Sequence, residues 1–148
     1  WGRLTARPFV PSSVDDAIPP DTFVQMPPTQ TAKVERLLKI SALPPEKTLA
    51  TLNKTRLPPK VAKAVPSLCE GSFVERAENL LVFGLPGRGK THVVCAIGHE
   101  LIQRGHRVLF TPTFALVQRL LAAKRDLRLE RELATLDGFD VIILDDIG

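Results

Sequence analysis

Residues 79–104 place a compact apolar run, a glycine-rich turn and an amphipathic segment in direct succession. The run 79–83 (Asn-Leu-Leu-Val-Phe) predicts a buried strand, because short apolar stretches bounded by turn residues are typical of strands covered on both faces. Residues 89–104 repeat apolar side chains at helical spacing, and Gly105 follows as a C-cap. The succession therefore predicts a strand, a tight turn and a helix.

The remainder of the second half continues this alternation. Residues 107–110 predict a second strand, 113–126 a helix, 128–136 a shorter helix and 141–144 a third strand. The helix over 113–126 is expected to bury an apolar side consisting of Leu116, Val117, Leu120 and Leu121. Apolar strands joined by helical crossovers indicate an α/β fold with a parallel sheet.

The glycine-rich turn satisfies the pattern G-x-x-x-x-G-K-[ST], called Walker A, between a predicted strand and a predicted helix. Glycines let the backbone turn tightly and aim several N–H donors at a polyphosphate. The helix N-terminus adds its positive dipole end, Lys90 reaches the β and γ phosphates, and the Thr91 hydroxyl occupies one Mg²⁺ position. The residues expected to bind the nucleotide are Gly84, Leu85, Pro86, Gly87, Arg88, Gly89, Lys90 and Thr91.

Two alternatives stay open at this motif. The pattern also fits a glycine turn beside a surface lysine, although the strand-to-helix setting favours a phosphate loop. Arg88 either touches phosphate or is a solvated loop arginine, and the second reading is favoured.

Two carboxylates follow the strand over 141–144, at the end of a parallel strand where such folds bind ligands. This pattern is called Walker B. Asp145 is expected to hold Mg²⁺, and Asp146 to orient or deprotonate the attacking water. Acidic residues also close strands as turn formers, but the phosphate loop upstream strengthens the catalytic interpretation. Lys90 and Asp146 are thus the candidate catalytic residues, and Thr91 and Asp145 the candidate metal ligands.

From about residue 33 to the end, the chain resembles the IstB family of insertion-sequence transposition helper ATPases, relatives of the DnaC helicase loaders within the AAA+ class. The resemblance rests on residues 71–79 (Gly-Ser-Phe-Val-Glu-Arg-Ala-Glu-Asn), 84–92, 104–108 (Arg-Gly-His-Arg-Val) and 143–148. The segment 71–79 separates this family from other phosphate-loop proteins, and is similar to the segment that borders the nucleotide base in such ATPases.

The resemblance implies ATP hydrolysis coupled to self-assembly on duplex DNA and to delivery of that DNA to a transposase. The implied fold is a P-loop NTPase of the AAA+ type, a three-layer parallel sheet. The wider AAA+ pattern has Glu where this chain has Asp146, whose carboxylate is one methylene shorter. The family continues beyond Gly148, so we expect a fragment truncated after Walker B and incomplete at the C-terminus. In the family's sheet order two later strands flank the strand over 79–83, which is therefore expected to lack both neighbours.

Proline and glycine are unevenly distributed along the chain. Eleven of 13 prolines lie in residues 1–70, whereas eight of nine glycines lie from Gly71 onward. We expect a Pro-rich, mostly irregular tail or loop over 1–32, a short helical segment over 33–70, and the N-terminal part of a P-loop ATPase core over 71–148. Within the first half, 31–40 predicts an amphipathic helix with Thr31 as N-cap, and 60–68 a weaker one interrupted by Pro66.

The sequence lacks the features of a membrane protein, a secreted protein and a disulfide- or zinc-stabilised protein. No apolar run is long enough to span a bilayer, and no signal peptide opens the chain, so we expect a cytoplasmic protein without a membrane partner. Cys69 and Cys95 lack the spacing of a disulfide framework or zinc site. His92, His99 and His106 are expected to be surface or packing residues.

All of the net positive charge of +4 lies in residues 1–70, with ten Lys and Arg against six Asp and Glu. Lys54, Arg56, Lys60 and Lys63 form one candidate DNA surface. The basic stretch over 119–131 is another, although interspersed carboxylates favour a solvated helix face there.

Three functions follow. The first is a Mg²⁺-dependent, ATP-binding AAA+ domain of a transposition helper, with duplex DNA, the element's transposase and further copies of the chain as partners. Hydrolysis is expected only if the missing C-terminal part is supplied. The second is a DnaC-like helicase loader, which acts on a replicative helicase. The third is a truncated remnant that binds nucleotide without turnover.

Overall fold

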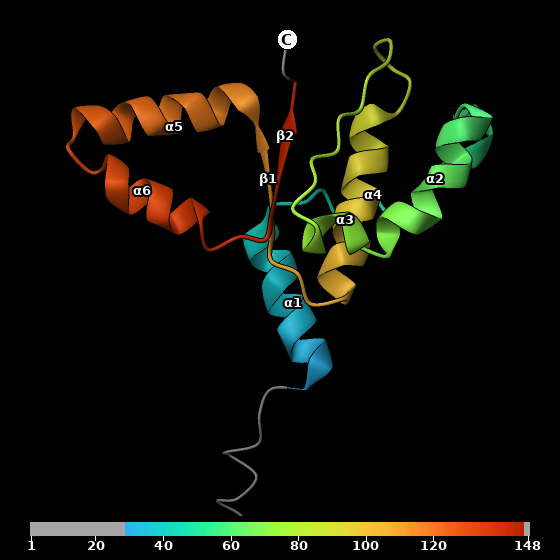
Figure 1. Ribbon diagram of the computed structural model, residues 1–148, viewed down its shortest axis with the longest axis horizontal. Helices are drawn as coiled ribbons and strands as arrows, with labels where there is room; N and C mark the ends of the chain where they lie inside the picture. The colour runs from blue at the N-terminus through green and yellow to red at the C-terminus, as the bar shows by residue number, and fades with distance from the viewer. Residues whose placement is uncertain (1–28, 147–148) are drawn as a thin grey trace, which may run out of the picture.

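The computed structural model describes residues 29–146 (Figure 1). Residues 1–28 of the tail expected over 1–32, and the last two residues of the 143–148 motif, lie outside this range, while α1 takes in residues 30–32. The helices are α1 (Gln30–Ser41), the short 3₁₀ helix η2 (Lys54–Arg56), α2 (Pro59–Cys69), α3 (Ser72–Glu75), α4 (Lys90–Gln103), α5 (Thr113–Arg125) and α6 (Leu129–Leu136). The strands are β1 (Val108–Pro112) and β2 (Val141–Asp145).

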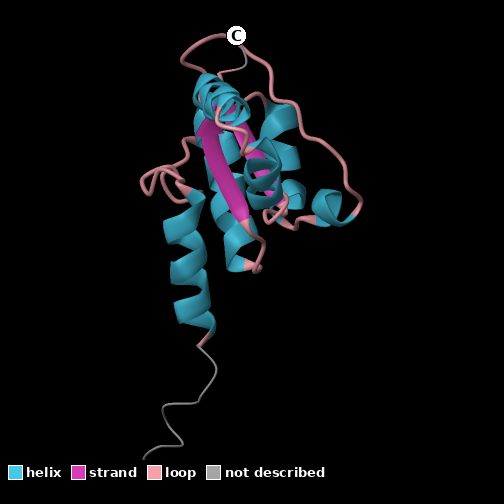
Figure 2. Cartoon of the chain, turned by 90° about the vertical axis from the view of Figure 1, so that its left-hand side faces the viewer, coloured by secondary structure: helices cyan, strands magenta, loops and turns pink. Residues whose placement is uncertain are grey.

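β1 and β2 form a parallel pair whose register runs from Val108 opposite Val141 to Pro112 opposite Asp145. The two strands run side by side (Figure 2). They lie between α4 on one side and α5 with α6 on the other (Figure 1). The predicted α/β class, parallel pairing and layered arrangement are thus confirmed in these two strands and their helices.

The predicted strand over 79–83 is wrong: this segment is irregular and largely exposed. Leu81 is 68% exposed and Phe83 87% exposed. Within the described residues, the sheet consists of β1 and β2 alone, and no backbone hydrogen bond reaches 79–83. An extended segment without a neighbour cannot pair its backbone groups, so a strand has nothing to stabilise it there.

The core surrounds α4. Cys95, Leu101, Ile102 and Val108 are almost fully buried, and apolar residues of α1 and α2 pack against them. The predicted helices over 31–40 and 60–68 are both confirmed as α1 and α2, with Pro66 inside α2. The N-cap of α1 is Thr29 rather than Thr31, because the Thr29 hydroxyl accepts from the backbone N–H of Ala32.

One close approach fixes the position of α4 against the sheet. A Cβ atom at Gly98 would lie 2.9 Å from Ile143 Cδ1 and 3.2 Å from Leu43 Cδ1. Glycine therefore lets α4 approach both β2 and the segment after α1.

The apolar side predicted for α5 is covered only in part. Leu116 and Leu120 are half-buried, whereas Val117 and Leu121 are 47% and 55% exposed. α5 contacts β1 and α6, but β1 and β2 are too few strands to cover its length. Among residues 29–146, no helix combines the length and hydropathy that crossing a bilayer requires.

Candidate functional site

The glycine-rich turn lies between the irregular segment 79–83 and the start of α4. Gly87 and Gly89 have φ angles of 73° and 83°, in the left-handed region that side chains disfavour. No atom of the part of the chain that the structure describes lies within 4 Å of a Cβ atom placed at either residue. The backbone conformation, rather than crowding, therefore requires glycine at both positions.

α4 begins at Lys90 with Gly89 as its N-cap, so no side chain caps its first turn. The first backbone N–H groups of the helix have no helical partner, and they lie at the positive end of its dipole. Lys90 Nζ donates to the carbonyl oxygens of Gly84 at 2.8 Å and Leu85 at 3.2 Å. The ammonium group thus lies against the turn, and together with the amides it makes a positive site suited to phosphate.

Thr91, the second residue of α4, meets the end of β2. Its hydroxyl donates to Asp145 Oδ1 and Oδ2, each at 3.0 Å, across 54 residues of sequence. Both residues are half-buried. A hydroxyl oxygen and a carboxylate that converge in this way are the hard oxygen donors that Mg²⁺ prefers.

Thr113 supports this arrangement and was missed by the sequence analysis. Its hydroxyl donates to the backbone carbonyl of Asp145 at 2.9 Å, which ties the start of α5 to the end of β2. The available signal was a threonine directly after a parallel strand, because the carboxyl ends of adjacent parallel strands share one edge of a sheet.

Four of the predicted site residues have exposed side chains. Leu85, Pro86 and Arg88 are exposed in the turn, and Arg88 has no ion pair within residues 29–146. Asp146 follows β2 with a φ of 55° and is exposed. Its side chain makes no hydrogen bond to the described part of the chain, whereas Asp145 is held by Thr91.

The segment 71–79 packs against the far end of α4 and then runs toward the turn. Gly71 has a φ of 82°, and a Cβ atom there would lie 2.9 Å from Leu101 Cδ2 and 3.3 Å from His106 Nε2. Arg76 donates two hydrogen bonds of 2.8 Å to the Glu78 carboxylate. These bonds lower the pKa of Glu78.

Two histidines tie the segment between α1 and η2 to α4. His92 Nε2 lies 3.1 Å from Thr51 Oγ1 and 3.1 Å from the Thr48 carbonyl oxygen. His99 Nε2 lies 3.0 Å from the Pro44 carbonyl oxygen. Both histidines are half-buried and pack as expected, and His92 directly follows the candidate metal ligand Thr91.

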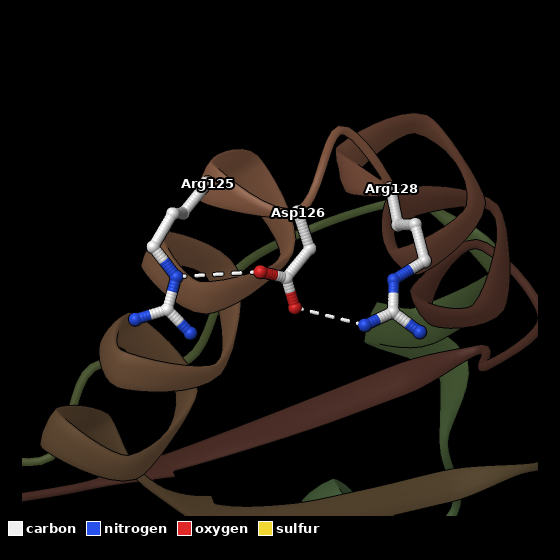
Figure 3. A network of polar contacts seen from close by, with 3 residues as sticks. All are labelled: Arg125, Asp126 and Arg128. Carbon is white, nitrogen blue, oxygen red and sulfur yellow. Dashed lines mark hydrogen bonds and ion pairs between the residues drawn. The ribbon is translucent and has the colours of Figure 1, made fainter.

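The two candidate DNA surfaces differ in their charge pairing. In the stretch 119–131, Arg119 pairs with Glu132, and Asp126 bridges Arg125 and Arg128 (Figure 3). Arg128, and then Arg125, lower the pKa of Asp126 through these hydrogen bonds. The other surface comprises Lys54, Arg56, Lys60 and Lys63, which are exposed and form no ion pair within the described range.

The chain is similar to a known protein family and to several individual proteins. A family model described as IstB-like ATP binding protein matches residues 27–148. A protein from Sinorhizobium fredii, named as an insertion sequence ATP-binding protein, is 45% identical over 117 residues, which cover 78% of this chain and 39% of that protein. A protein from Pseudomonas aeruginosa, named as an ATP-binding protein of insertion sequence IS21, is 44% identical over 115 residues, covering 78% of this chain and 43% of the relative.

A more distant relative is the replicative helicase loader DnaC of Buchnera aphidicola. It is 30% identical over 92 residues, covering 60% of this chain and 37% of the loader. The chain spans less than half the length of each of these three relatives.

Proposed function

Because the chain belongs to the family of IstB-like ATP-binding proteins, we propose that it binds ATP with Mg²⁺ at residues 84–91 and forms part of a transposition helper ATPase. The single observation that carries this proposal is the pair of hydrogen bonds from Thr91 to Asp145. It joins the end of the Walker A loop to the Walker B carboxylate, two motifs that the sequence separates widely.

Each residue of the loop has a separate task in this proposal. The backbone amides over 84–91 donate to the phosphate oxygens, and the positive end of the α4 dipole favours their negative charge. Lys90, whose ammonium already lies against the turn at Gly84, neutralises the β and γ phosphates. Thr91 and Asp145 hold Mg²⁺, which neutralises charge on the phosphates when it is bound.

We propose that ATP hydrolysis requires a protein as long as the relatives, because the chain matches less than half of the length of each. In that protein Asp146 orients or deprotonates the attacking water, and Lys90 stabilises the charge that develops on the transferred phosphoryl group. The exposure of Asp146 leaves its carboxylate accessible to a bound nucleotide.

The proposed partners are duplex DNA, the transposase of the same insertion element and further copies of the chain, all in the cytoplasm. Support comes from the names of the relatives, which are insertion sequence proteins, and from the net charge of +4, which favours a polyanionic partner.

The similarity to a DnaC protein favours a second candidate function, that of a helicase loader with the same nucleotide site. Capture of a replicative helicase by the purified chain, without capture of the element's transposase, would favour the loader. If the chain binds nucleotide but hydrolyses no ATP, even when extended to the length of its relatives, the third function applies, that of a remnant without turnover.

Nucleotide binding is tested by titrating a fluorescent ATP analogue in the presence of Mg²⁺. The wild-type chain should bind the analogue, and Lys90→Ala should bind it at least tenfold more weakly, since a charged hydrogen bond contributes about 1.5–3 kcal/mol. Lys63→Ala removes the same charge from the exposed surface of α2 and should bind like the wild type. Equal binding by all three proteins would refute the assignment of the loop.

A further inference from the structure

A cleft lined by both charged and apolar residues lies at the opposite end of the strands from Thr91 and Asp145. It has a volume of about 510 Å³. Lys33 and Arg36 of α1 line one wall, while Arg107 and Asp140, which directly precede β1 and β2, line the other. The cleft is therefore built around the residues that lead into the two strands.

The cleft is positively charged. Three of its side chains are cationic, and Asp140 is its only carboxylate among the lining residues. The Asp140 carboxylate accepts from the backbone N–H of Arg107 at 2.7 Å, and the Asp140 N–H donates back to the Arg107 carbonyl at 2.8 Å. Within residues 29–146, Lys33, Arg36 and Arg107 form no ion pair.

Two of the cations have defined positions. The guanidinium carbon of Arg107 lies 5.7 Å from the centroid of the Phe139 ring, a cation–π contact that orients the planar group. Lys33 Nζ lies 3.6 Å from the place where a Cβ atom of Gly105 would sit. Because Gly105 has a φ of 94° and no side chain, it turns the chain out of α4 and leaves room for the lysine.

We infer that this cleft binds the sugar-phosphate backbone of duplex DNA, at a surface separate from the nucleotide loop. The inference rests on the proposed action on DNA and specifies where DNA contacts the chain. Phosphate contacts require long cationic side chains without a committed partner, and a stacked guanidinium presents a preorganised pair of donors to phosphate. It also gives a role to the segment 104–108, whose Gly105 and Arg107 line the cleft and take no part in the nucleotide site.

The other basic surfaces fit this role less well. The cations over 119–131 are largely paired with carboxylates. Among residues 29–146, the surface made by Lys54, Arg56, Lys60 and Lys63 forms no ion pair and has no corresponding contact that orients a cation. It therefore supplies the matched control.

The test is the salt dependence of duplex binding, measured by fluorescence anisotropy with the 148-residue chain and labelled duplexes of unrelated sequence. The variant K33Q/R36Q/R107Q removes three cleft charges, and K54Q/R56Q/K60Q removes three charges elsewhere. Since each phosphate contact contributes about −0.9 to the slope of log K against log salt, the cleft variant should reduce the magnitude of that slope by roughly 3 on every duplex. The control should change it by less than about 1.

The cleft variant is expected to fold, because Asp140 is bonded to the backbone of Arg107 and not to its guanidinium group. Unchanged binding of the fluorescent ATP analogue by the cleft variant checks this point. An equal loss in both triple variants, or none in the cleft variant, would overturn the inference.

Two further readouts separate this inference from the proposed function. If the wild-type chain binds no duplex, the proposed DNA partner fails together with the cleft assignment, while nucleotide binding stands on its own assay. If the cleft variant loses binding of a poly-glutamate peptide but retains duplex binding, the cleft accepts acidic peptides and the inference is wrong.

Discussion

The Thr91 hydroxyl lies 3.0 Å from both carboxylate oxygens of Asp145 and joins the first turn of α4 to the end of β2. Each partner is fixed by its own element. Thr91 stands where the turn enters α4, and Asp145 is held through its backbone carbonyl by Thr113 at the start of α5. The carboxylate of Asp145 therefore faces the end of the glycine-rich turn.

We predict that removing this hydroxyl abolishes the effect of Mg²⁺ on nucleotide binding. Thr91→Ala should bind a fluorescent ATP analogue in Mg²⁺ about as weakly as the wild type does in EDTA, a loss of roughly tenfold or more. Thr91→Ser keeps the hydroxyl and should retain most of the Mg²⁺ effect. If Thr91→Ala responded to Mg²⁺ as strongly as the wild type, Thr91 could not be a metal ligand.

The close contact at Gly98 predicts a loss of stability on enlargement. Gly98→Val places new methyl groups against Ile143 and Leu43, where even a Cβ atom would lie within 3.3 Å of both side chains. Overpacking of this kind costs about 1–3 kcal/mol in the free energy of unfolding. Urea denaturation measures the difference, with Ala64→Val on the exposed side of α2 as control. A Gly98→Val protein as stable as that control would contradict the packing of α4 on β2.

The two thiols are predicted to be unreactive in the folded chain. Cys95 is fully buried, and desolvation raises its pKa to about 11, with smaller effects from neighbouring charges. Burial also raises the pKa of Cys69. Because the thiolate is the reactive form, both should resist a disulfide reagent at pH 8 until the chain unfolds.

An introduced cysteine provides the control for this experiment. Ser67→Cys, on the exposed side of α2, should react at once under the same conditions. The raised pKa of Cys95 also makes the free energy of unfolding depend on pH. Its stabilising contribution is complete below about pH 9 and is lost as the pH rises from 9 toward 11. Immediate labelling of all three thiols would show that the core around α4 is open.

The sequence predicted the local features of this chain better than the distant ones. The turn over 84–89, α4 and the pair β1 and β2 follow from glycine placement and hydrophobic periodicity, which act between near neighbours. Burial along 79–83 was predicted wrongly, and the burial predicted for α5 holds only in part, because an apolar pattern shows which side chains a segment can bury and not which elements are present to cover them. The contacts of His92 with Thr48 and Thr51 join segments far apart in sequence, so no local pattern indicated them.

Hydrogen exchange over residues 79–83 tests whether this apolar segment has a hydrogen-bonding neighbour. Its backbone N–H groups donate to no described residue, so their hydrogen exchange should proceed close to the rate of an unfolded peptide. Peptides from the middle of α4, where Cys95 and Leu101 are buried, should exchange far more slowly and serve as the internal reference. Exchange measured by mass spectrometry over a time series compares the two segments in one sample. If residues 79–83 were as protected from exchange as α4, their backbone N–H groups would be hydrogen-bonded to a neighbour. The strand predicted from the sequence would then form in solution.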